Sequence, residues 1–424
     1  MWSRRAVLAA ISATALAPER AEARPPAAAG PDPALEEAFW REIQEAFTLD
    51  RTLINLNNGG VSPSPRVVHE AYKRYLDVAN QAPAYHLWQL EEPGIEAVRR
   101  DLAAAAGCDP EELAITRNAS ESLQIAQLGF ELAPGDEVLT TEHDYPRMLA
   151  TWEQRVRRDG IVLKKIPFPV PPSSQAAIVD AFRSAIGPKT KIVHLCHITN
   201  LSGHILPVRE VCELARAAGA RSIVDGAHAF AHFPFRIAEL GCDVYGTSLH
   251  KWLFAPIGTG FLYVRKDRIP EIWPLQAAAP EAAADIRKFE EIGTHPAAGH
   301  NAIAEALQFH RRIGPERKIA RLRWLKKRWI DGLGGFPGVS VLAHPDPALG
   351  GAIGTFSIEG VEPGALTSWL WTKHRIVATP IAAVTQAGRP PSFSGVRVTP
   401  SVYTTPEEID RFVDAMAGWI GGRR

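Results

Sequence analysis

The most constraining feature of this chain is a regular alternation of short apolar runs with helix-like segments between about residues 110 and 265. Amphipathic segments such as Val208–Ala218 lie between several of the runs. Strands that alternate with helices predict a mainly parallel sheet with helices on both faces, and therefore an α/β fold. The apolar runs are Leu113–Thr116, Glu137–Thr140, Ile161–Ile166, Ile192–Ile198, Ser222–Val224, Val244–Gly246 and Gly260–Val264.

Polar clusters directly follow several of these runs. Ligands of such sheets bind beside the carboxyl ends of the strands, so we expect the clusters to meet at one edge of the sheet. The clusters are Asn118–Glu121, His143–Tyr145, Asn200, Asp225–His228 and Ser248–Lys251.

Residues after about 300 have a different character. One or two long helices are expected over Asn301–Gly332, and short strands near Ile353–Ile358 and Val396–Val398. The last helix has a marked start, because Thr405 and Glu408 have the spacing of a capping box. We therefore predict a large domain over residues 34–300, with an N-terminal part that packs against the small domain, and a small α+β domain over 301–424.

Composition restricts the function classes. The chain has 424 residues, of which 46% are hydrophobic, and its 47 Lys and Arg residues balance its 47 Asp and Glu residues. A neutral balance gives no reason to expect a nucleic-acid partner.

The four cysteines form no CxxC pair, and no carboxylate joins the nearby His194, His197 and His204 at ligand spacing, so we expect no metal site. The cationic run Arg317–Trp329 is interpreted as a solvated helix face.

The first residues predict an export signal. Ser3-Arg4-Arg5 precedes an apolar stretch that is too short to span a membrane, and Ala21-Glu22-Ala23 would suit a signal peptidase. The arginine pair resembles a twin-arginine (Tat) signal, with a Sec signal or an uncleaved start as the alternatives. We expect an exported or periplasmic protein, with the signal over residues 1–23 and a flexible leader over 24–33. No other stretch suggests stable membrane insertion.

Lys251 is the strongest candidate for chemistry. It follows an apolar strand and has Ser248 and His250, two possible phosphate ligands, beside it. A desolvated lysine near a carbonyl cofactor is what imine chemistry requires, although a surface lysine at a strand end has the same local pattern. Asp225 also follows a buried strand, where it could keep the ring nitrogen of pyridoxal 5′-phosphate (PLP) protonated or simply cap a helix.

A possible anion site precedes the helix that begins near Ala119. Backbone N–H groups at a helix start, together with Ser120, could bind a phosphate. The same residues fit a simple helix cap without a ligand equally well.

Several segments together resemble the class V aminotransferase family, PLP enzymes of fold type I, from about Asn55 to residue 420. The resemblance implies an α/β fold with a large, seven-stranded, mainly parallel sheet domain and a smaller C-terminal α+β domain. LNNGG (56–60), TRNASES and EIGTHPA (291–297) look closest to the isopenicillin-N-epimerase-like branch. The matching segments are TRNASES (116–122), TEHDYP (141–146), CHITNLSG (196–203), VDGAHA (224–229), SLHK (248–251) and VRVTPSVYTTPEEID (396–410).

The resemblance implies catalytic roles for Lys251 as the Schiff-base lysine and Asp225 as the partner of the pyridinium nitrogen. It implies that His143 stacks on the cofactor ring, with Tyr145 as the alternative for this role. Arg397 would bind the substrate's α-carboxylate as a bidentate fork, with Asn58 and Tyr145 as further substrate-binding candidates.

Other residues would hold PLP. Asn200 would bond the ring hydroxyl oxygen, with His228 beside it. Thr294 matches a threonine that reaches the phosphate of the neighbouring subunit, which implies a homodimer. The expected phosphate ligands are Ala119, Ser120, Ser248 and His250.

The sequence leaves the reaction open. Amino-group chemistry at Cα of an amino-acid-like or peptide-derived substrate, by transamination or epimerisation, is favoured. β-Elimination at a carbon–sulfur bond and a non-catalytic binding protein of this fold are the alternatives. The segment Thr372–Ser394, where cysteine desulfurases carry their catalytic cysteine, contains none, so a desulfurase is not expected.

Overall fold

The computed structural model describes residues 32–167, 170–172, 174–344, 346–384 and 393–422. The export signal expected over residues 1–23 and most of the leader expected over 24–33 lie outside this part of the chain. Within the described residues, none of the helices has the length and apolar character needed to cross a membrane.

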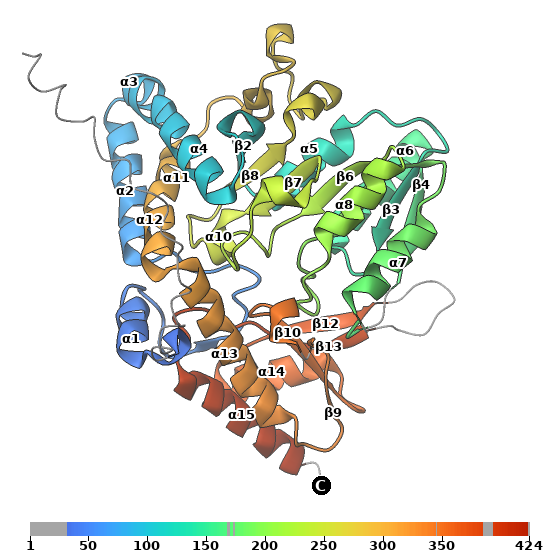
Figure 1. Cartoon of the computed structure of the whole chain (residues 1–424). Helices are drawn as coiled ribbons and strands as arrows, with labels where there is room; N and C mark the ends of the chain where they lie inside the picture. The colour runs from blue at the N-terminus through green and yellow to red at the C-terminus, as the bar shows by residue number, and fades with distance from the viewer. Residues whose placement is uncertain (1–31, 168–169, 173, 345, 385–392, 423–424) are drawn as a thin grey trace, which may run out of the picture.

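In the described part of the chain, the larger sheet has seven strands in the order β2-β8-β7-β6-β5-β3-β4 (Figure 1). Only β8 runs antiparallel to its neighbours in this sheet, so the predicted mainly parallel sheet is confirmed. The strands are β2 (Leu113–Thr116), β3 (Glu137–Thr141), β4 (Val162–Ile166), β5 (Thr190–Cys196), β6 (Arg221–Asp225), β7 (Val244–Ser248) and β8 (Gly260–Val264).

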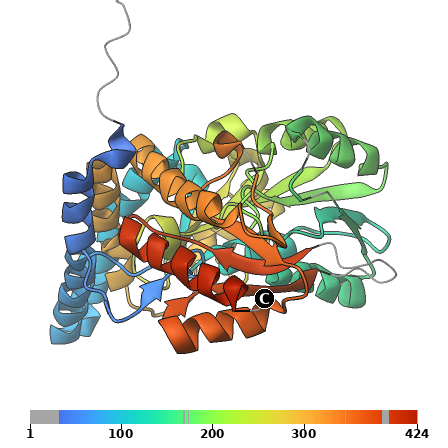
Figure 2. The same ribbon diagram turned by 90° about the horizontal axis from the view of Figure 1, so that it is seen from below.

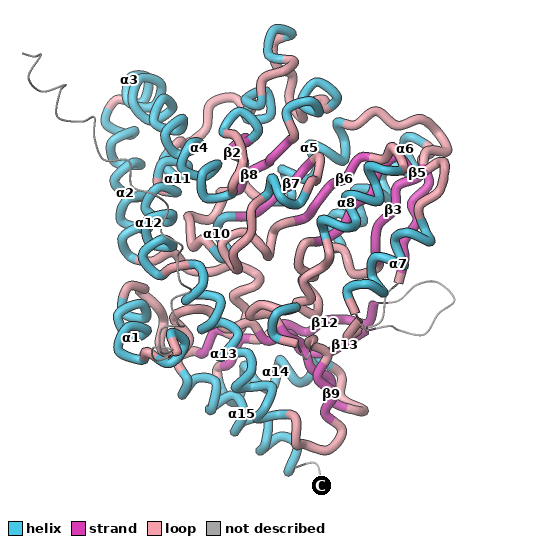
Figure 3. Tube along the Cα trace, viewed as in Figure 1, coloured by secondary structure: helices cyan, strands magenta, loops and turns pink. Residues whose placement is uncertain are grey.

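Alternate residues of these strands enter two different hydrophobic cores. Val224 and Tyr245 belong to the core beneath α4 (Glu92–Ala106), α7 (Gln175–Ala185) and α8 (Val208–Ala217). Their neighbours Ile223 and Val244 belong to the core beneath α5 (Ala119–Gly129) and α6 (Pro146–Asp159). Successive strand side chains point to opposite faces, so helices bury both faces of the sheet (Figure 3).

The smaller domain surrounds a sheet ordered β12-β13-β10-β9. Its strands pair antiparallel, and its core includes Trp329, Phe356 and Phe412. Figure 2 brings this domain toward the viewer, with its C-terminal helix in red. The elements are β9 (Val339–Val341), β10 (Gly354–Ile358), β12 (Thr379–Val384), β13 (Phe393–Val398), α13 (Pro315–Leu333), α14 (Pro363–His374) and α15 (Pro406–Gly421). The capping box predicted from Thr405 and Glu408 starts α15.

The N-terminal segment contacts both domains. Its strand β1 (Ile54–Asn55) pairs in parallel with β11 (Ile376–Val377) of the small domain. Helix α1 (Glu37–Glu45) lies beside α13 (Figure 1). Beside the large domain lie the helices α2 (Arg66–Gln81), α3 (Pro83–His86), α11 (Ala298–Asn301) and α12 (Ile303–Ile313). The short helices α9 (Ile237–Leu240) and α10 (Leu249–Trp252) connect strands of the large sheet.

The cationic run on α13 is not a solvated face, contrary to the interpretation from sequence. Lys318 and Arg321 are fully buried and Lys326 nearly so. The Lys318 ammonium donates to the carbonyl of Trp252 and lies 4.1 Å from the Phe254 ring centroid. Arg321 pairs with Glu37 and donates to the carbonyl of Ala34. Helix α13 therefore lies between the N-terminal segment and the large domain, and its cations bond to both.

Candidate active site

A cavity of about 200 Å³ opens beside the carboxyl ends of the central strands. It brings together most of the residues that the sequence assigned to a cofactor site, although they come from segments far apart in the chain. The predicted residues that line it are Ala119, Ser120, Tyr145, Asn200, Asp225, His228, Ser248, His250 and Lys251.

Lys251 lies in the short helix α10, directly after strand β7. Its Nζ is 3.2 Å from Nε2 of His228. Burial lowers the pKa of Lys251 to about 8, against the opposing effect of the Asp225 carboxylate, and the charge of Arg397 lowers it further. Near neutral pH the neutral form is therefore a minority, yet a far larger share than in an ordinary lysine, and this neutral form is the one that attacks a carbonyl group.

Asp225 is the last residue of strand β6 and is buried. Its Oδ1 accepts a hydrogen bond from the backbone N–H of Ala227 at 2.9 Å. Burial raises the pKa of this carboxyl to about 6, while the Ala227 N–H and the charge of Lys251 oppose the change. A protonated ring nitrogen next to Asp225 would stabilise its anionic form.

The N-terminus of α5 borders the same cavity. Asn118 caps the helix, with its side chain accepting from the N–H of Glu121, and the N–H of Ala119 donates to Ser248 Oγ at 2.9 Å. Gly260 allows the helix start to approach the sheet, because a Cβ there would lie only 2.7 Å from Cα of Asn118. The site thus places backbone N–H groups and hydroxyls together, an arrangement suited to an anion.

Arg397, on β13, is buried at the edge of this site and is not among the residues that line the cavity. Its guanidinium donates to the carbonyl of Asn200 and to Oδ1 of Asn57, each at 2.9 Å. Burial lowers its pKa to about 10, and Tyr145 opposes this shift, so Tyr145 lies within electrostatic range. At neutral pH Arg397 is a cation held by the N-terminal loop and by the loop after β5.

Besides Arg397, three more predicted residues lie outside the cavity lining. Asn58 is fully buried, and both ends of its amide are used within the protein: Nδ2 donates to the carbonyls of Asn55 and Thr399, and Oδ1 accepts from Tyr403. The substrate-binding role predicted for Asn58 stays a prediction, and its neighbour Asn57 is the residue of this loop that contacts Arg397.

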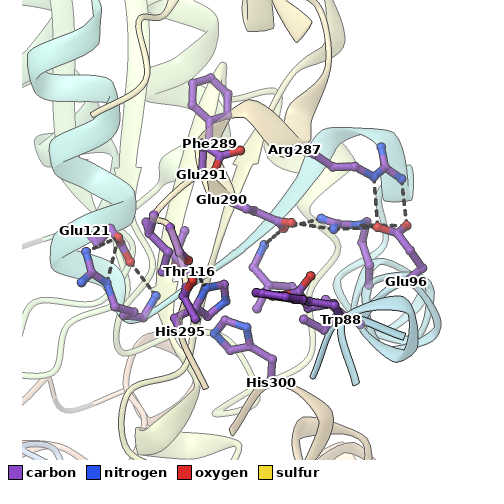
Figure 4. Close-up of a pocket in the computed structure, with 18 residues that line it drawn as sticks. Trp88, Glu96, Thr116, Glu121, Arg287, Phe289, Glu290, Glu291, His295 and His300 are labelled. Atoms are coloured by element: carbon purple, nitrogen blue, oxygen red, sulfur yellow. Dashed lines mark hydrogen bonds and ion pairs between the residues drawn. The ribbon is translucent and has the colours of Figure 1, made fainter. Parts of the chain in front are cut away.

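His143 is also fully buried, and burial lowers the pKa of its imidazole to about 4. Thr294 lines a separate cavity of about 340 Å³. Trp88, His295 and His300 line the same cavity (Figure 4). Glu121 lines this second cavity, where it pairs with Arg117.

The cavity also contains residues that sequence reasoning missed. Arg147 and Met148 begin helix α6, Cys196 ends strand β5, and Gly60 belongs to the N-terminal loop. Cys196 and Gly60 belong to the quoted segments CHITNLSG and LNNGG, and Arg147 directly follows TEHDYP, so proximity to these motifs was the available signal. Among the described residues no group of three or more His, Cys, Asp or Glu side chains could hold a metal ion.

The sequence profile of the family described as Aminotransferase class-V matches residues 54–412. The chain belongs to the class V aminotransferase family. An isopenicillin N epimerase from Streptomyces clavuligerus is 32% identical over 91% of this class V chain and 99% of its own length.

Two solved structures show the same fold. The apo cysteine desulfurase of Thermococcus onnurineus matches with a TM-score of 0.79 at 23% identity, over 90% of this chain and 98% of its own. The cystine C–S lyase C-DES in complex with cysteine persulfide matches with a TM-score of 0.75 at 25% identity, over 87% and 97% of the two chains.

The residues of this class V enzyme fit its family's cofactor, PLP. Among the described residues, Asn200 Oδ1, His228 Nδ1 and His250 Nδ1 are buried without a hydrogen-bond partner. These atoms belong to residues predicted to hold the ring hydroxyl oxygen and the phosphate. A PLP molecule would supply the missing partners, with its aldehyde carbon toward Lys251 and its ring nitrogen toward Asp225. The protein is a PLP-dependent enzyme that acts at Cα of an amino-acid-like substrate.

Proposed function

We propose that this enzyme epimerises an amino-acid centre of a small peptide-derived metabolite. The main support is the isopenicillin N epimerase that aligns with 91% of the chain at 32% identity. Epimerisation requires removal of the Cα proton and its return on the opposite side. Lys251 and Tyr145 line the same cavity, so two ionisable groups are available to a single substrate.

In the proposed reaction Arg397 binds the α-carboxylate and so fixes which substituent of Cα faces Lys251. PLP, when bound, accepts the electron pair left at Cα, which makes that proton acidic. The free amine of Lys251 would take the proton, and its pKa of about 8 suits this transfer near neutral pH. Tyr145 would donate a proton to the opposite face of the substrate Cα.

A carbon–sulfur lyase is the second candidate, supported by the structural likeness to the C-DES lyase. Elimination requires the same loss of the Cα proton, and the two reactions separate only at the next step. A cysteine desulfurase is disfavoured further by Cys196. This thiol lines the cavity, yet burial and the nearby carboxylates of Asp144 and Asp225 raise its pKa well above the usual value, and a neutral thiol is a poor nucleophile.

Incubation of holoenzyme with amine-bearing metabolites in heavy water tests the proposal. Candidate substrates are first found by a change in the cofactor spectrum. Deuterium at Cα together with the inverted, amine-retaining product is expected. An oxo acid with pyridoxamine phosphate would instead indicate transamination. Release of a β-substituent with pyruvate or an enamine product, without exchange into recovered substrate, would reject epimerisation in favour of the lyase.

We also propose that the enzyme is exported by the Tat route and acts as a homodimer. PLP is made in the cytoplasm, and the Tat route carries folded proteins, so the Ser3-Arg4-Arg5 signal would suit a holoenzyme that leaves with its cofactor. An exported enzyme meets few free cytoplasmic metabolites, which supports a secreted or envelope-bound substrate. The position of Thr294 outside its own chain's cofactor cavity is compatible with a role in the partner's site.

A further inference from the structure

The charged residues of the cofactor cavity are few. Among the described residues that line it, histidines aside, the acidic and basic residues are Arg147, Asp225 and Lys251. Asp225 and Lys251 serve the ring nitrogen and the aldehyde carbon of PLP. A phosphate monoester carries close to two negative charges at neutral pH, and these require compensation at the other end of the cofactor.

The phosphate ligands expected from the sequence supply no full positive charge. Ser120 and Ser248 are neutral, and burial lowers the pKa of His250 to about 4, which disfavours a charged imidazole. The N-terminus of α5 contributes roughly half a charge. Arg117, although close in sequence, is paired with Glu121 at 2.6 Å, and its guanidinium lines the second cavity.

Arg147 occupies the first turn of α6, beside the first turn of α5. The two helices are joined by a hydrogen bond from Gln124 Nε2 to Thr151 Oγ1 at 3.1 Å. Each of the two helices follows a strand of the large sheet. Ser120 lies one turn before Gln124 in α5, and Arg147 lies one turn before Thr151 in α6. Both Ser120 and Arg147 line the cavity.

No residue in the described part of the chain pairs with the Arg147 guanidinium, and the side chain is exposed. Other arginines of the same helix differ in this respect: Arg155 and Arg158 both pair with Asp159. An arginine at the wall of an anion site that leaves its five donors unused within the protein is available to the ligand.

We propose that Arg147 pairs with the phosphate group of PLP and supplies the full positive charge that the α5 N-terminus, Ser248 and His250 do not. This role concerns the cofactor and does not depend on which reaction the enzyme performs. If the epimerase proposal fails, the proposed role of Arg147 still stands. If the role of Arg147 is disproved, the epimerase proposal still stands.

The test compares two forms of the cofactor. Apoprotein is titrated with PLP and, separately, with pyridoxal, which lacks the phosphate, and both dissociation constants are measured from the absorbance of the bound form. Arg147→Met is expected to weaken PLP about 10- to 100-fold and to leave pyridoxal unchanged, because a charge-assisted bond to the phosphate is lost. Arg147→Lys should recover part of the loss. Arg157→Met, an exposed arginine on α6 outside the cavity, is the matched control and should bind both forms normally.

Two results would overturn the proposal. One is a PLP affinity of Arg147→Met equal to that of the control, with a raised KM for substrate, which would assign Arg147 to a distal anionic group of the substrate. The other is equal weakening of PLP and pyridoxal, which would indicate a general change of the cavity. Circular dichroism and melting temperature establish that the variant is folded. If Arg147→Met does not fold, the same two titrations of Arg147→Gln provide the comparison.

Discussion

The amine nitrogen of Lys251 lies 3.2 Å from Nε2 of His228, and the two side chains follow neighbouring strands of the large sheet. Burial lowers the pKa of His228 well below its usual value, and the charges of Lys251 and Arg397 lower it further. His228 is therefore a neutral partner that orients the lysine amine without adding a charge beside it. This arrangement links the parallel sheet to the chemistry proposed for Lys251.

The position of covalent attachment is the first prediction. Borohydride reduction of the holoenzyme followed by peptide mapping should place the PLP adduct on Lys251, because this amine is buried in the cavity and partly neutral. Lys251→Ala should carry no adduct. An adduct on a different lysine of the wild-type protein would contradict the assignment.

The pH dependence of imine formation is the second prediction. The rate at which apoprotein reacts with PLP should rise through a midpoint near pH 8, because only the neutral Lys251 amine attacks. The Asp225 carboxylate raises the pKa of Lys251, so Asp225→Asn should move this midpoint to lower pH. The same variant should lose roughly 10- to 100-fold in kcat, since an amide does not stabilise the pyridinium charge. A midpoint and kcat equal to wild type would leave Asp225 with a purely structural role.

Replacement of Arg397 by lysine should raise KM for the substrate by roughly 10- to 100-fold, with a smaller effect on kcat. A lysine carries the positive charge, but it lacks the bidentate fork that binds a carboxylate. It also lacks the second donor group with which Arg397 bonds to Asn57. Steady-state kinetics on the substrate found in the heavy-water screen give both constants. Arg411→Lys, an exposed change in the small domain, is the control. An unchanged KM in Arg397→Lys would exclude this residue from carboxylate binding.

Cys196→Ala should retain full activity, because the raised pKa of this thiol keeps it protonated. Incubation of wild-type protein with cysteine should yield neither protein-bound persulfide nor stoichiometric alanine. Mass spectrometry of the protein and amino-acid analysis of the supernatant provide the measurements. A persulfide on Cys196, lost in the alanine variant, would reveal a desulfurase.

Export is the fifth prediction. Replacement of Arg4 and Arg5 together by lysine should leave the enzyme in the cytoplasm, since the Tat route reads the arginine pair. Cell fractionation with immunoblotting of both compartments gives the result. Undiminished export of the double variant would point to the Sec route or another pathway.

Much of the large domain could be predicted because its strands are buried on both faces and appear as apolar runs. Leu113–Thr116 and Gly260–Val264 coincide with β2 and β8. The predicted single or double helix over Asn301–Gly332 divides into α12 and α13 at Gly314, whose φ of 86° suits glycine.

The remaining errors concern partners that are distant in the chain. The cations of α13 look like a solvated face in sequence because their partners, such as Glu37 and the Trp252 carbonyl, lie far away. Asn57 and Asn58 are indistinguishable in the LNNGG segment, and only the folded loop shows which amide contacts Arg397. Arg147 was missed because a single exposed arginine has no pattern of its own.

The pairing of β1 with β11 also determines the order in which this protein can complete its fold during synthesis. Ile54 pairs with Ile376, so nearly the whole chain must leave the ribosome before this pair can form. The large sheet closes among residues between 113 and 264 and can assemble earlier, on contacts of much lower sequence separation. The Asn57–Arg397 contact, adjacent to this strand pair, can likewise form only after translation has almost ended. A nascent chain can therefore offer Lys251 and Asp225 to the cofactor before Arg397 is in place.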